Sequence, residues 1–442
     1  MTAAQDASIP QKRTHTRRWV AFMMWLAIAI NYMDRGNIAV AIPLMAKEFH
    51  LSPAIMGVVL SAFFWPYFIL QIPAGWFADR VGHRISLALS IGAWSLATAA
   101  TAAARGTASL VFFRVILGIG ESGAYPSAAG ITARWFPDKE RSRVSGLFDS
   151  GSKFGAALAL PVTAWLILVT GWRAAFIISG AAGLVLTAAW WFYYREPEQH
   201  KYMNAAELNY IRDGQLKRDG VGGKQPMKWY ELLRYRNIWA MCLGFFTTNY
   251  VSYFFYTWFP VYLTTVHKMP LMKMGLIASV PLIIAMFAEI AAGLVADRLY
   301  AHGWPITRVR KTILIIGELM GACIAFAVFA HGVAGAIVLM TICKSGQTMA
   351  NSQVWTLPGD VSPQNMTSQV ASLQNTVSNL AGVVGPIVTG LILQVTRAFD
   401  YALFVIAGIA ILGAINFLFL LGKVEPIKPK GELVAAAARS AS

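Results

Sequence analysis

Two charged residues lie near the middle of an apolar stretch that is long enough to cross a lipid bilayer. The stretch covers residues 19–45, WVAFMMWLAIAINYMDRGNIAVAIPLM, and contains Asp34 and Arg35. An ionised side chain at mid-membrane costs at least about 2.5–3.5 kcal/mol on insertion scales, so such residues usually face a watered cavity lined by protein. The pair therefore predicts the rim of a transport site. A buried ion pair that only holds helices together is the alternative.

A second charged pair lies in the apolar segment 108–132. Arg114 and Glu121 are seven residues apart, so on a helix they lie about two turns, roughly 10 Å, apart on nearly one face. Both could therefore line the same cavity. A guanidinium can hold a carboxylate through two parallel hydrogen bonds, which makes Arg114 a candidate for holding an anionic substrate. A permanent pair with Glu121 is the alternative.

Asp34 and Glu121 are the candidate proton carriers. Burial favours the neutral form of a carboxyl group, whereas a nearby arginine favours the ionised form, so a carboxyl under both influences can titrate near the working pH. An anion that occupied Arg114 would remove the counter-charge of Glu121 and favour its protonation. The two residues would then link the anion to the proton.

The composition indicates the elements that position these residues. Of the 442 residues 57% are hydrophobic and 13% charged, and the mean hydropathy is +0.53, which is too apolar for one soluble domain. Runs of about 20 apolar residues cross the roughly 30 Å hydrocarbon layer as helices, because a helix satisfies its own backbone hydrogen bonds. We expect an all-α integral membrane protein with twelve transmembrane helices, at residues 19–42, 54–77, 85–104, 108–132, 144–170, 173–194, 237–264, 271–295, 312–331, 333–357, 367–395 and 399–422.

The distribution of positive charge predicts the orientation. The net charge is +16, and 27 of the 37 Lys and Arg residues lie in segments that face the cytoplasm if the N-terminus does. By the positive-inside rule, both termini are therefore cytoplasmic. The charge is explained by the lipid bilayer and gives no reason to expect nucleic acid. The polar segment 1–18 and the length of the first apolar run predict that the first helix is retained, unlike a signal peptide.

An internal repeat divides the chain into two six-helix domains, residues 1–194 and 237–442, joined by a cytoplasmic linker at 195–236. GWFADR at 75–80 recurs as GLVADR at 293–298, and Asn31-Tyr32 recurs as Asn249-Tyr250 at the same separation. Repeats of this kind are typical of transporters. Within the linker, AELNYIRD predicts a short amphipathic surface helix, with a plain flexible linker as the alternative.

The sequence also resembles a known family. GWFADRVGHR at 75–84 resembles the signature loop of the major facilitator superfamily. NYMDRGNIAVA at 31–41, SAFFWPYFILQIPAGW at 61–76 and FFRVILGIGESGAYPS at 112–127 resemble its anion:cation symporter family. That family includes bacterial permeases for galactonate, hexuronates, glucarate, tartrate and phthalate, and the animal vesicular glutamate carriers. The animal carriers place an arginine in helix seven, and LGFFTTNYVSYFFYTWFP has none, which favours the bacterial sugar-acid branch.

The resemblance implies roles for individual residues. Asp34 and Glu121 would carry protons, Arg35 would take part in coupling, and Arg114 would hold the carboxylate of the substrate. The candidate substrate-binding residues are Arg114, Tyr32, Tyr67, Ser152, Ser352, Trp355 and Asn375.

The loops after helices two and eight predict a cytoplasmic gate. Asp79 and Asp297 end their helices there, where each could pair with arginine in one state of the transport cycle. The candidate gate residues are Asp79, Arg80, Arg84, Asp297 and Arg298.

Two lysines in apolar spans have simpler explanations. Lys153 is four residues after Asp149, so an i,i+4 ion pair is expected. Lys344 is expected to form a structural ion pair with Glu289 or Glu318.

These observations predict a monomeric secondary active transporter of the bacterial inner membrane. It would carry a small organic acid anion, such as galactonate, a hexuronate or glucarate, into the cell with protons by alternating access. No cofactor beyond the proton gradient, no metal and no enzymatic activity is expected, because the sequence shows no P-loop, no Ser/His/Asp set and no metal-ligand spacing. The alternatives are a permease for tartrate, another dicarboxylate or an aromatic acid, a Na⁺-coupled carrier or facilitative uniporter, and a membrane sensor without transport activity.

Overall fold

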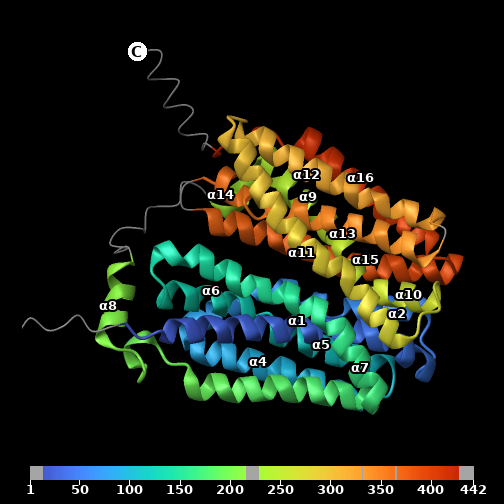
Figure 1. The fold of residues 1–442 in the computed structure, drawn as a ribbon, viewed down its shortest axis with the longest axis horizontal. Coiled ribbons are helices and arrows are strands. Elements are labelled where there is room, and N and C mark those ends of the chain that lie inside the picture. Colours follow the sequence, from blue (N-terminus) through green and yellow to red (C-terminus); the bar gives the residue numbers. More distant parts are fainter. Residues whose placement is uncertain (1–12, 216–227, 331, 364–365, 428–442) are drawn as a thin grey trace, which may run out of the picture.

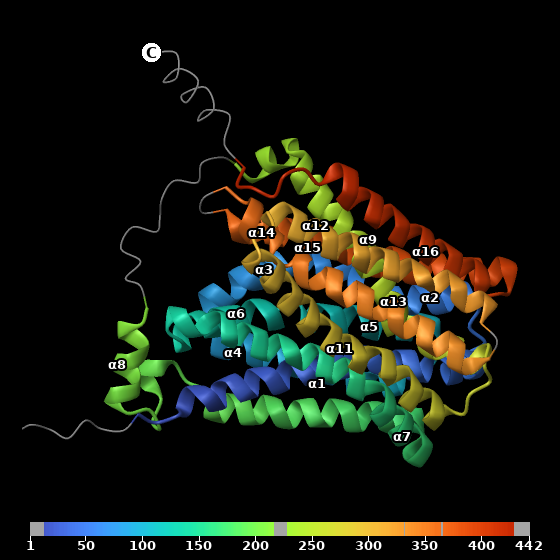
Figure 2. The same cartoon turned by 45° about the horizontal axis from the view of Figure 1, so that its top comes forward.

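The computed structural model describes residues 13–215, 228–330, 332–363 and 366–427, and within them the chain is helical without strands. Figures 1 and 2 show two groups of long helices that lie side by side. The first group contains α1 (Thr16–Glu48), α2 (Pro53–Ser61), α3 (Phe64–Val81), α4 (His83–Ala100), α5 (Thr107–Glu121), α6 (Ala124–Trp135) and α7 (Asp138–Tyr193). The second contains α9 (Arg236–Thr257), α10 (Phe259–Thr265), α11 (Leu271–Ala301), α12 (Ile306–Ala322), α13 (Val333–Val354), α14 (Leu357–Val361), α15 (Thr367–Thr396) and α16 (Asp400–Ile415).

Each of the twelve predicted spans coincides with helical structure. Seven spans are made of two consecutive segments, namely α2–α3, α5–α6, α9–α10, α13–α14, α4 with the 3-10 segment Thr101–Ala103, α12 with the 3-10 segment Cys323–Phe329, and α16 with the π-helical segment Asn416–Leu420. Within the described residues, nine helices are long and apolar enough to cross a membrane, and α7 among them contains two spans. The two remaining spans, α1 and α9–α10, are less apolar because polar and charged residues lie in their middles.

Gly171 separates the two spans that lie within α7. Its φ is 81° and its ψ is 162°, inside an otherwise helical segment of 56 residues. A residue with a Cβ atom rarely adopts this backbone conformation, whereas glycine does so without strain. The glycine therefore lets the chain reverse direction with almost no loop.

The two groups meet mainly along two pairs of helices, α2 with α15 and α7 with α11. At Gly57 of α2 an added Cβ would lie 2.4 Å from the carbonyl oxygen of Pro386, and at Gly390 of α15 it would lie 2.5 Å from that of Pro53. Small residues allow such close approach of helix backbones. This contact lies at the end of the molecule opposite α8 (Ala205–Asp213), so that end is tightly closed.

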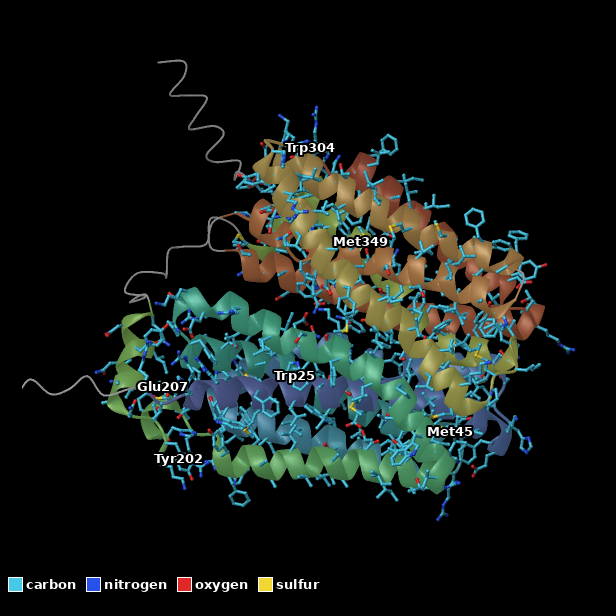
Figure 3. All side chains as sticks on the ribbon, in the orientation of Figure 1. Trp25, Met45, Tyr202, Glu207, Trp304 and Met349 are labelled. Carbon is cyan, nitrogen blue, oxygen red and sulfur yellow. The ribbon has the colours of Figure 1, made fainter. Side chains whose placement is uncertain are left out.

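Helix α8 confirms the amphipathic helix predicted in the linker, and it holds the start of α1 (Figure 3). The fully buried Glu207 accepts hydrogen bonds from the backbone N–H groups of Thr16 at 3.1 Å and Arg17 at 3.4 Å, and from Arg17 Nη1 at 3.0 Å. The first N–H groups of a helix have no partner within the helix, and a carboxylate there is favoured by the helix dipole. A residue of the linker therefore caps α1.

Candidate functional site

A cavity of about 790 Å³ lies between the two groups of helices. One wall comes from α1, α3, α6 and α7, and the other from α9, α11, α13 and α15. Its lining continues to Trp76 and Asp79 in the last turns of α3, so the cavity reaches toward the end that carries α8. The volume is within the range of small-molecule binding sites.

Arg35 is the guanidinium that lines this cavity, and Glu121 lies behind it. Arg35 Nη2 and Nε donate to Glu121 Oε2 at 2.7 and 3.1 Å. The guanidinium carbon also lies 4.4–4.8 Å from the ring centroids of Tyr32, Phe63 and Tyr67. Glu121 is 1% exposed. Three aromatic rings and one buried carboxylate therefore fix the direction in which Arg35 points.

Asp34, the neighbour of Arg35, points away from the cavity lining and is 2% exposed. Its Oδ1 accepts a long hydrogen bond of 3.4 Å from Asn37, and its Oδ2 has no hydrogen-bond partner among the described residues. An ionised carboxylate in such a place is strongly disfavoured. The surroundings therefore suit a carboxyl group that carries a proton.

Arg114 does not line the cavity in this conformation. It is 3% exposed, its guanidinium carbon lies 5.1 Å from the centroid of the Phe63 ring, and its Nε has no hydrogen-bond partner in the part of the chain that the structure describes. The ion-pair partner of Glu121 is Arg35. Arg114 and Glu121 therefore do not form an ion pair here. A permanent pair of this kind was the alternative to substrate binding by Arg114.

Lys153 forms the i,i+4 ion pair predicted with Asp149, at 2.5 Å, and a second one at 3.5 Å with Glu289. Glu289 belongs to α11, so this second contact joins the two groups of helices. The hydroxyl of Tyr125 donates to the other oxygen of Asp149 at 3.1 Å. Lys153 is therefore neutralised by two acids.

The ion pair predicted for Lys344 is wrong. Its Nζ donates to Ser252 Oγ at 3.2 Å and lies 4.8 Å from the ring centroid of Tyr256. Glu289 pairs with Lys153 instead. Glu318 is fully buried and accepts hydrogen bonds from Thr247 Oγ1, Thr248 Oγ1 and Gln347 Nε2 at 2.6–3.2 Å. Both acids therefore have partners other than Lys344. Lys344 itself lines the cavity.

Most of the neutral residues predicted for the site also line the cavity. They are Tyr32, Tyr67, Ser152, Trp355 and Asn375. Asn375 Nδ2 donates to Gln71 Oε1 at 2.8 Å, which links α15 to α3. Ser352 is not part of the lining, and its hydroxyl donates to the carbonyl of Met349 at 2.7 Å. Gln71 was not predicted, although a glutamine inside the apolar run FILQIP is a usable signal.

The predicted gate residues make no ion pair with one another in the described parts of the chain. Arg80 stacks on Trp76, with 3.9 Å to the ring centroid, and Arg84 donates to the carbonyl of Trp191 at 2.7 Å. Asp297 and Arg298 are exposed on α11. Asp79 lines the cavity. In this conformation, the gate residues therefore do not join the two groups of helices.

Comparisons with known proteins give the family and the fold. The family model described as the Major Facilitator Superfamily matches residues 24–386. The D-galactonate transporter of Escherichia coli O6:H1 is 33% identical over 430 residues, which cover 96% of this chain and 100% of that protein. A probable galactarate/D-glucarate transporter of Escherichia coli K12 is 31% identical over 442 residues, which cover 97% and 98%.

A solved structure is similar over nearly the whole length. A crystal structure of a bacterial homolog to the human lysosomal transporter Spinster, in an inward-facing and unoccupied conformation, matches with a TM-score of 0.77 at 19% sequence identity, covering 93% of this chain and 98% of that one. Together with the helices described above, these matches confirm the predicted twelve-helix fold.

Proposed function

The chain belongs to the major facilitator superfamily of membrane transporters, and from that premise we propose that it carries a sugar acid anion into the cell together with protons. The protein is a multi-pass membrane transporter and not an enzyme. The proposal concerns the substrate, the coupling ion and the direction of transport. The observation that carries it is the cavity-lining Arg35 with the buried Glu121 as its partner.

An arginine that can pair either with a carboxyl group or with the substrate is sufficient to couple transport of the proton to transport of the substrate. When Glu121 is protonated, its attraction for the guanidinium weakens and Arg35 becomes available to the carboxylate of the substrate. When Glu121 loses its proton, it recovers Arg35 and the substrate is released. Binding of the anion and binding of the proton therefore favour each other, as linkage requires.

The conformation corresponds to the released state of this scheme. Arg35 is held by Glu121, and the cavity reaches toward the α8 end. Because the positive-inside rule predicts that this end is cytoplasmic, we propose that the structure is open to the inside, with both termini cytoplasmic in the bacterial inner membrane. The close contact of α2 with α15 would then be the closed external end.

Two further residues complete the proposed mechanism. Asp34, buried without a cation partner in the described residues, is the proposed second proton site. Arg114 does not line the cavity in this conformation, and it is the proposed additional contact, beside Arg35, for the same substrate carboxylate after the two groups of helices move. The transporter is proposed to act as a monomer, because the cavity and all of these residues belong to one chain.

We propose a sugar acid as the substrate because of the names of two relatives and because of the polar side chains that line the cavity. One relative is named a D-galactonate transporter and another a probable galactarate/D-glucarate transporter. The neutral lining, with Gln71, Asn249, Ser152 and Asn375, offers the hydrogen-bonding groups that a hydroxylated chain requires.

Uptake by purified protein in proteoliposomes tests the proposal. An inward pH gradient should drive accumulation of labelled galactonate or galactarate, and a protonophore should abolish accumulation while leaving exchange intact. Accumulation that follows a Na⁺ gradient, or uptake that ends at equal concentrations, would refute proton coupling. A protein that binds these acids without transporting them would instead be a sensor.

A further inference from the structure

Three cationic side chains line the cavity within the described residues, and they differ in their partners. Arg35 pairs with Glu121, and Lys153 pairs with Asp149 and Glu289. In the parts of the chain that the structure describes, no carboxylate oxygen lies within 4.0 Å of Lys344 Nζ. Lys344 is therefore the one of these three cations that makes no ion pair at contact distance, and Glu289 acts on it only from longer range.

We propose that Lys344 holds a second acid group of the substrate, so that the transported anion is a dicarboxylate with one acid group on Arg35 and the other on Lys344. This inference rests on the proposed function and narrows its substrate class. A monocarboxylate would leave Lys344 unoccupied.

The environment of Lys344 favours a ligand over a structural role. The residue is 5% exposed, and its ammonium group has three donors, of which Ser252 accepts one, at 3.2 Å. A buried charge without a partner is costly, and an anion that completes its hydrogen bonds recovers that cost. The phenol ring of Tyr256, 4.8 Å away, further orients the ammonium group.

A series of ring contacts connects the two cations. Arg35 contacts Phe63, whose ring centroid is 5.0 Å from that of Phe64, and Phe64 is 4.5 Å from Tyr253. Tyr253 is in turn 6.5 Å from Tyr256, which contacts Lys344. Tyr253 and Tyr256 also line the cavity. Phe63 and Phe64 are fully buried and are not part of the lining, so of this series only Tyr253 and Tyr256 share the cavity with the two cations.

The two cations also belong to different halves of the fold. Arg35 is on α1 and Lys344 is on α13. A dicarboxylate would therefore connect the two groups of helices through its own acid groups, whereas a monocarboxylate would contact a cation of only one of them. Recognition by both halves is a direct way to make closure depend on the correct substrate.

The test compares two sugar acids that differ only in the terminal group at C6. Galactarate has a carboxylate there and galactonate a hydroxymethyl group. Dissociation constants for both are measured with purified full-length protein by titration calorimetry or thermal shift. The variants are Lys344→Met, which removes the charge, and Lys344→Arg, which keeps a cation. Lys273→Met is the matched control, because Lys273 is an exposed lysine on α11 outside the cavity lining.

We expect the wild-type protein to bind galactarate at least tenfold more tightly than galactonate. Lys344→Met should reduce that ratio at least tenfold, Lys344→Arg should retain most of it, and Lys273→Met should not change it. Equal wild-type affinities, or a Lys344→Met variant that loses both acids equally or keeps the wild-type ratio, would overturn the inference and leave the proposed function standing. A wild-type protein that binds neither acid would overturn both.

Discussion

Replacing Glu121 by glutamine tests the coupling scheme most directly. Glutamine keeps the shape of a protonated carboxyl group and can accept a hydrogen bond from Arg35, but it cannot titrate. The variant should therefore bind sugar acid and exchange it across the membrane, yet fail to accumulate it against a gradient. Binding should also lose the part of its pH dependence that arises from Glu121.

The size of the effect on affinity follows from the two bonds between Arg35 and Glu121, at 2.7 and 3.1 Å. A hydrogen bond to a charged group contributes about 1.5–3 kcal/mol, and a neutral one about 0.5–1.5 kcal/mol. The substitution should therefore weaken the hold on Arg35 by roughly 2 kcal/mol. Since about 1.4 kcal/mol corresponds to a factor of ten, the affinity for the anion above neutral pH should rise roughly 30-fold.

Counterflow and pH-gradient-driven uptake are measured side by side in the same proteoliposome preparation, with dissociation constants at several pH values. Glu198→Gln is the control, because Glu198 is a half-exposed glutamate of the linker that pairs with Arg212. Full gradient-driven accumulation by Glu121→Gln would show that Glu121 is not an essential proton carrier, and the scheme would then depend on Asp34 alone. A weaker affinity would show that Glu121 does not compete with the substrate for Arg35.

Three further predictions concern other parts of the molecule. Arg114→Lys should weaken substrate binding in a direct binding assay, because an ammonium group lacks the planar fork of a guanidinium; unchanged affinity would leave the anion to Arg35. Glu207→Ala should lower the free energy of unfolding by about 2–3 kcal/mol, seen as a lower unfolding temperature in detergent, because it removes the cap of α1 and a buried partner of Arg17. Hydrogen bonds from Arg173 and Trp172 lower the pKa of Glu48 from its ordinary value of 4.5. Glu48 therefore stabilises the fold above pH 4.5 and loses this effect as the pH falls through the lowered pKa, so the unfolding temperatures of wild type and Glu48→Gln should converge in acid.

The sequence predicts the helices well because each span is a local property. Twenty apolar residues must form a helix in a membrane, and the polar interruptions that matter lie within the same span. The reversal at Gly171 is also local, since only the backbone of one residue changes. By contrast, the two-part construction of spans such as α5–α6 and α13–α14 depends on packing against neighbouring helices and was not predicted.

The pairing of charges is the part that local reasoning does not reach. Helical spacing brings Arg114 and Glu121 onto one face, but spacing alone does not reveal that Arg35, from another helix, takes the carboxylate. The same holds for Lys344, whose expected acids are occupied by Lys153 and by hydroxyl and amide groups. Which cation pairs with which carboxylate depends on distances between helices, and a single sequence does not contain those distances.

The contact at Gly57 bears on how often each conformation is populated. Alanine there would place a methyl group 2.4 Å from the carbonyl oxygen of Pro386 and 3.2 Å from Cα of Ile387, and neither backbone atom can rotate away. The cost arises only while α2 and α15 touch, so the substitution would act like a ligand that binds the opposite conformation more tightly. Each 1.4 kcal/mol of that cost would shift the ratio of the two populations about tenfold. Gly57→Ala protein would therefore spend more of its cycle open at the end that is closed here, and would be the preparation in which to capture that conformation.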